Sequence, residues 1–156
     1  MRLPKYKQSD VIRGLIIYPL GDTIAALILH EFSIYRLLGM MVVGGLIYSL
    51  EIPAWFSYIN ERFTGIGRTL MAMLYFNPLW IARHLVFIFL FTGQVSTIHW
   101  SILIIALKSF AVNVPVAFTA NYVIQNKLPL RWRFLSSAVF SSLMAIYYAL
   151  SRVIFK

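Results

Sequence analysis

Cysteine is absent from the 156-residue chain, and acidic residues are few. Without cysteine the chain has no disulfides, thiolate metal ligands or cysteine nucleophiles. Only 12% of the residues are charged, with 14 lysines and arginines against 5 acids, which gives a formal net charge of +9. Because the chain has so little polar surface, we predict no nucleic-acid partner despite the positive charge.

Recognisable enzyme motifs are also missing. The three histidines, His30, His84 and His99, lack the spacing of a metal site, and the sequence has no His-Glu-x-x-His motif or glycine-rich phosphate loop. Asp22 and Glu51 could pair as two catalytic carboxylates, but no motif around them supports this. We therefore predict no catalytic residues, no metal and no cofactor.

Apolar residues are what the chain has in excess, at 60% with a mean hydropathy of +0.78. A membrane-spanning helix needs roughly 20 mostly apolar residues. Five segments approach or exceed that length, and they run from about Val11 to Leu29, Leu37 to Ile59, Leu70 to Thr92, Ile98 to Ile124 and Phe134 to Phe155. We predict an all-α polytopic transmembrane bundle with four to five spans, forming a single integral membrane domain over residues 1–156. In the four-span alternative, the first or last segment is a partly embedded amphipathic helix.

The basic residues between these segments are distributed unequally. In a five-span arrangement, one side of the membrane has nine and the other has three. The two sets are Arg2, Lys5, Lys7, Arg13, Arg62, Arg68, Lys127, Arg131 and Arg133 against Arg36, Arg152 and Lys156. Since short basic loops are retained on the cytoplasmic side, we expect the N-terminus on the cytoplasmic or equivalent side.

Ionisable side chains lie within the apolar segments. They are Asp22, Glu51, Arg83, His84 and Lys108. A charge there costs about 2.5 to 3.5 kcal/mol on insertion scales, so these groups should face protein or water. Two interpretations stay open: they form ion pairs that hold the bundle together, or they line a pathway for a polar solute. Glu51 moves towards an interface if its span boundary shifts, and Lys108 can snorkel.

Small and amide side chains recur every four residues in the last two segments, which places them on one face of each helix. The rows are Ser109, Asn113, Ala117 and Asn121, then Ser137, Ser141, Ala145 and Ala149. We include Asn113 and Asn121 among the pathway candidates, whereas the second row favours close helix packing. Prolines at 19, 53, 78 and 115 also interrupt the spans, as they do both in transporters and in ordinary kinked helices.

A pattern of residues along nearly the whole chain resembles the Mpv-seventeen and 22-kDa peroxisomal membrane protein family. It comprises Gly21-Asp22, Arg36, Gly44, Trp55-Phe56, Arg62-Phe63, Gly65, Pro78, Pro115, Asn121-Tyr122, Leu128-Pro129, Arg133 and Tyr147. The chain departs from the family at Glu51-Ile52-Pro53, where a Gly-Pro is usual, and at Met144, where tryptophan is typical.

This resemblance implies an integral protein of mitochondrial, peroxisomal or related membranes, with channel-like passage of small solutes and no cofactor. The matching positions, expected to mix packing with pore lining, are Gly21, Asp22, Trp55, Arg62, Pro115, Asn121 and Arg133. The altered Gly-Pro region puts a shared gating property in doubt.

Three functional classes follow from these observations. The first is a channel or carrier for small polar solutes or metabolites, formed by one chain or by a homo-oligomer. The second is a small amino-acid exporter of the bacterial inner membrane. The third is a non-transporting assembly or scaffold protein, in which the intramembrane charges are static pairs and the small-residue rows contact partners.

Overall fold

The computed structural model describes the backbone of residues 6–154 and the side chains of residues 6–148. This part of the chain is helical apart from short connections and contains no strand. Its elements are α1 (Gln8–Ile28), α2 (Ile34–Val42), the π-helix η1 (Val43–Tyr48), α3 (Ser49–Arg62), α4 (Gly65–Tyr75), α5 (Pro78–Phe91), the 3-10 helix η2 (Val95–Thr97), α6 (Ser101–Asn126) and α7 (Leu130–Ile154). Arg2, Lys5 and Lys156, and the side chains of Ala149 and Arg152, lie outside the described residues.

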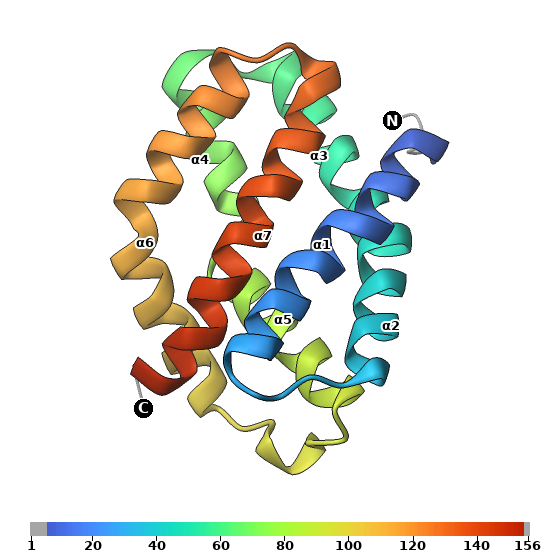
Figure 1. Ribbon diagram of the computed structural model, residues 1–156. Coiled ribbons are helices and arrows are strands. Elements are labelled where there is room, and N and C mark those ends of the chain that lie inside the picture. Colours follow the sequence, from blue (N-terminus) through green and yellow to red (C-terminus); the bar gives the residue numbers. More distant parts are fainter. Residues whose placement is uncertain (1–5, 155–156) are drawn as a thin grey trace.

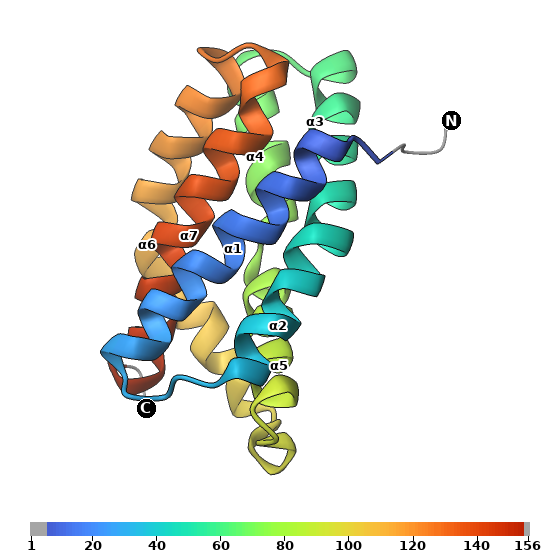
Figure 2. The same ribbon diagram turned by 45° about the vertical axis from the view of Figure 1, so that its right-hand side comes forward.

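The helices form one antiparallel bundle (Figures 1 and 2). α2, η1 and α3 follow one another as a single long segment, and α4 and α5 form another. The connections at residues 29–33 and 92–100 lie at one end of the bundle, and those at residues 63–64 and 127–129 lie at the other (Figure 1). Consecutive segments therefore run in opposite directions, as expected for a chain that crosses a bilayer repeatedly.

Four segments are long and apolar enough to cross a membrane, namely Gln8–Ile28, Ile34–Arg62, Gly65–Phe91 and Ser101–Asn126. The expectation of an all-α bundle with membrane-spanning helices is confirmed to this extent. α7, the segment expected to be a fifth span, has 25 residues. In Figure 1 it lies in front of the bundle, between α6 and α1.

The second segment begins earlier than predicted. We expected it to start at Leu37 and placed Arg36 in the preceding connection, but α2 begins at Ile34 and Arg36 is 1% exposed. The prediction that Arg36 flanks a span at the membrane surface is therefore wrong. Its burial has a specific reason, which is an acidic partner on α1.

Proline has different effects in the different segments. Pro78 occupies the first turn of α5, where its missing N–H leaves no helical hydrogen bond unmade. The helix is interrupted just before it, between α4 and α5. The Asn77 side chain caps the new helix by accepting hydrogen bonds from the backbone N–H groups of Leu79 at 2.8 Å and Trp80 at 3.2 Å. The prolines at 19, 53 and 115 instead remain inside continuous helices.

Glycine allows α1 to approach its neighbours closely. Gly14 faces Gly44 of η1, and a Cβ on either residue would overlap the backbone of the other. A Cβ on Gly21 would fall 2.6 Å from the Cα of Ser142 on α7. α1 is thereby held between η1 and α7, which places its single mid-helix acid, Asp22, within the bundle.

Candidate functional site

Asp22 and Arg36 form an ion pair in the interior of the bundle. Both side chains are 2% exposed. The Arg36 Nε and Nη2 atoms donate to the two Asp22 carboxylate oxygens, each at 2.7 Å. This parallel, two-bond geometry is the strongest arrangement open to an arginine and a carboxylate. The pair joins α1 to α2 across the connection at residues 29–33.

His84 connects this pair to a buried tyrosine. Its Nε2 lies 3.9 Å from an Asp22 oxygen, and its Nδ1 lies 3.3 Å from the Tyr48 hydroxyl. His84 and Tyr48 are 3% and 0% exposed. Trp80, one turn before His84 on α5, stacks on the imidazole at a centroid distance of 5.7 Å. The histidine is thus oriented by the Tyr48 contact at Nδ1 and the stacked Trp80 ring, while its buried Nε2 faces the Asp22 carboxylate beyond hydrogen-bond distance.

Glu51 and Arg83 form a second ion pair, between α3 and α5. The Arg83 Nη2 and Nη1 atoms donate to the Glu51 carboxylate at 2.9 and 3.2 Å, and the Tyr75 hydroxyl donates to it at 2.7 Å. In contrast to the first pair, the two charged side chains are 35% and 37% exposed. The Arg83 guanidinium also lies over the Tyr48 ring, 5.5 Å from its centroid.

Together these side chains form one series of neighbouring ionisable and polar groups, which we call the ionisable chain. Its members are linked by hydrogen bonds, by two charge contacts of 3.8 and 3.9 Å, and by one cation–π contact. It runs through Glu31, Arg36, Asp22, His84, Tyr48, Arg83, Glu51 and Tyr75. Both of its ends reach the surface, since the Glu31 side chain is 41% exposed and the Glu51 side chain 37%. Its centre is closed to solvent, because its four middle members are all buried, namely Arg36, Asp22, His84 and Tyr48.

The amide row of α6 is buried, as the four-residue spacing predicted. Ser109, Asn113, Ala117 and Asn121 are all less than 10% exposed. The Asn113 amide contacts the Tyr148 hydroxyl of α7 at 3.4 Å, and the Asn121 amide donates to the Ala117 carbonyl of its own helix at 2.9 Å. The Asn113 contact joins α6 to α7, the Asn121 contact stays within α6, and neither joins the ionisable chain.

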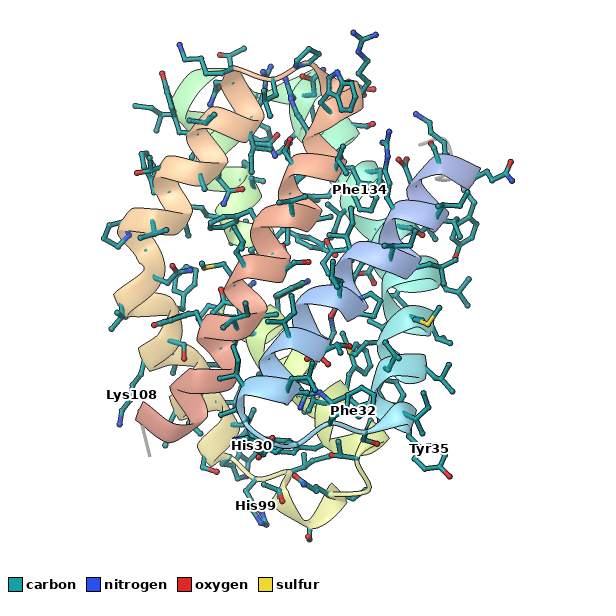
Figure 3. The ribbon with its side chains drawn as sticks, in the orientation of Figure 1. His30, Phe32, Tyr35, His99, Lys108 and Phe134 are labelled. Atoms are coloured by element: carbon teal, nitrogen blue, oxygen red, sulfur yellow. The ribbon has the colours of Figure 1, made fainter. Side chains whose placement is uncertain are left out.

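Lys108 is separate from both groups. It is exposed on α6, and in Figure 3 its side chain points away from the bundle near the end that carries His99. Ser109 is buried, and Lys108, the position before it and about 100° away around the helix, is exposed. Of the five ionisable candidates, Lys108 alone does not reach the interior.

The remaining positions of the family pattern have structural contacts. The Trp55 indole donates to the Met71 carbonyl at 3.0 Å, and Arg62 lies over the Tyr58 ring at 4.5 Å. Arg133 is 5% exposed and donates to the Leu128 carbonyl at 3.0 Å and the Asn60 side-chain oxygen at 2.7 Å. These contacts lie near helix ends or between helices. They indicate that Trp55, Arg62 and Arg133 have packing roles.

Pro115 lies in a different environment. With Thr119, Ala120 and Val123 it lines an open, largely apolar groove between α6 and α7, with a volume of about 720 Å³. The groove has almost no polar surface and contains no member of the ionisable chain.

Four members of the ionisable chain were not among the site residues predicted from the sequence, namely Glu31, Arg36, Tyr48 and Tyr75. The spacing of Asp22 and Arg36 on either side of a short connection was a usable signal, because a helical hairpin brings such positions together. The sequence contained no signal for Tyr48 and Tyr75, since tyrosine within an apolar segment is equally compatible with ordinary packing.

Comparison with known proteins gives no matching family model, curated protein or solved structure.

Proposed function

We propose that this protein forms a channel-like or carrier pathway for small polar solutes or metabolites across a membrane. The observation that supports this most directly is the ionisable chain, which extends from an exposed carboxylate at one end of the bundle to a half-exposed ion pair within it. Chains of acids, histidine and arginine inside membrane spans mark ion, proton and solute pathways. A purely structural role would require the two ion pairs separately. It would not require that His84 and Tyr48 lie between them and link them.

The arrangement corresponds to a closed form. Asp22 and Arg36 neutralise each other and are sealed from solvent, so a solute has to exchange with them to pass. A solute with a carboxylate can replace Asp22 on Arg36, and one with an ammonium group can replace Arg36 on Asp22. Organic acids and amino acids therefore belong among the first compounds to test, and the latter would fit a small exporter.

The proposal includes α7 as a fifth span and a cytoplasmic N-terminus. α7 is as long as the crossing segments and turns its described small residues Ser137, Ala138 and Ala145 inwards. We propose membership of the family that the sequence pattern resembles, which implies a mitochondrial or peroxisomal membrane. A bacterial inner membrane is the alternative location.

A non-transporting scaffold is the second candidate. It is favoured by the geometry of the Asp22–Arg36 pair, whose two short hydrogen bonds are also what a purely structural pair would have. In that case the ionisable chain would hold the first three segments in register and would carry nothing.

Purified protein in liposomes distinguishes the two. We expect flux above that of empty vesicles for at least one solute in a panel of ions, amino acids and organic acids. Glu51→Gln removes one charge of the ionisable chain and should reduce this flux, whereas Glu61→Gln, at an exposed acid at the end of α3, should not. Absence of flux for every solute from folded wild-type protein would favour the scaffold.

A further inference from the structure

The Glu51–Arg83 ion pair is partly exposed in the middle of two apolar segments. Glu51 lies within the segment Ile34–Arg62 and Arg83 within Gly65–Phe91, far from the connections at either end. At that depth the surrounding solvent of a lone protomer is hydrocarbon, where charged side chains almost always face protein or water. Yet more than a third of each of these two side chains is uncovered.

The surface around the pair is apolar. Leu79, one turn before Arg83 on α5, is 66% exposed. Leu79 and Arg83 share a helix face because they are four residues apart. We call the surface formed by Glu51, Leu79 and Arg83 the α3–α5 face. It combines an exposed apolar side chain, which is suited to a membrane, with one acid and one base that are unsuited to lipid.

We propose that this α3–α5 face is the interface with a second copy of the same chain. A two-fold axis brings the same patch of both copies together. A patch with one positive and one negative group complements its own rotated copy, because each acid can face the base of the other protomer. No other partner is required, and both charges leave the lipid in the same step.

The inference stands apart from transport, since covering two charges is reason enough for association. If the proposed pathway also exists, the interface places one end of the ionisable chain between two protomers. Dimerisation and flux are measured separately, so either can fail without the other.

Cross-linking tests the face directly, because the natural chain has no cysteine. We compare Leu79→Cys with Leu143→Cys, a position that is 58% exposed on α7, a helix that contributes neither Glu51 nor Arg83. Oxidation or a short bifunctional maleimide in liposomes should give a covalent dimer for Leu79→Cys and at least tenfold less for Leu143→Cys. Equal dimer yields at the two positions would overturn the proposal.

A second measurement does not depend on cysteine geometry. Fluorophore-labelled wild-type protein, diluted in liposomes, should show two photobleaching steps, and the Glu51→Leu/Arg83→Leu double variant should dimerise at least tenfold more weakly. A wild-type protein that is monomeric at every density refutes the interface. So does reaction of Leu79→Cys in the monomer with a membrane-impermeant maleimide, because the pair would then face a water-filled crevice.

Discussion

Replacing Asp22 by Asn isolates the electrostatic role of the buried ion pair. Asparagine has nearly the same shape as aspartate, so the change leaves no cavity and removes only the charge. Arg36 then remains 1% exposed, with Glu31 at 3.8 Å as its remaining carboxylate neighbour. Removing one partner of a buried pair typically costs about 3 to 5 kcal/mol, and we expect Asp22→Asn to lie in that range.

The cost should come from the isolated charge and not from lost packing. Replacing both partners by apolar residues of similar volume, as in Asp22→Leu/Arg36→Met, should therefore restore most of the stability lost by either single variant. Glu61→Gln, at an exposed site, should change stability by less than about 0.5 kcal/mol.

Reversible unfolding in mixed micelles, followed by circular dichroism, measures these variants together with the single variants Asp22→Leu and Arg36→Met, which complete the double-mutant cycle. A loss below about 1 kcal/mol for Asp22→Asn contradicts a buried, water-free pair. A double variant as unstable as the two single losses added together would show that packing, not charge, accounts for the effect.

Three further predictions concern the bundle. Gly44→Ala should destabilise the protein by about 1 to 3 kcal/mol because its Cβ meets the Gly14 backbone, whereas Gly67→Ala, whose Cβ would make an ordinary contact with Phe63 at 3.8 Å, should stabilise by about 0.5 to 1 kcal/mol in the same unfolding assay. Asn77→Ala should cost about 0.5 to 2 kcal/mol through loss of the α5 cap, and Asn77→Asp should recover much of it. In oriented vesicles, Thr64→Cys should react with an impermeant maleimide from the cytoplasmic side and Ser96→Cys from the opposite side; labelling of both from one side would contradict the proposed topology.

The sequence was informative about elements and much less so about pairing. Segment length and hydropathy predicted the positions of the helices to within about five residues, because the bilayer sets the length of a span. The four-residue spacing from Ser109 to Asn121 correctly predicted a buried face, since helical periodicity is a local property.

Contacts between segments could not be read in the same way. The pairing of Glu51 with Arg83 and Tyr75 depends on how α3 packs against α4 and α5, over separations of 32 and 24 residues. Arg36 was missed because a basic residue near a connection normally indicates a membrane surface. The break at Pro78 was anticipated as an interruption, but the cap by Asn77 that stabilises it was not.

The most direct test of the ionisable chain is the initial flux rate of Tyr48→Phe beside that of Tyr147→Phe in matched liposomes. Each variant loses one hydroxyl and keeps its ring; the Tyr48 hydroxyl contacts His84 at 3.3 Å, whereas the Tyr147 hydroxyl donates to the Ser109 carbonyl at 3.1 Å, outside the ionisable chain. If the chain is the pathway, Tyr48→Phe should slow flux strongly while Tyr147→Phe stays near the wild-type rate. Equal rates for the two variants, with both proteins folded, would show that solute does not pass along the ionisable chain.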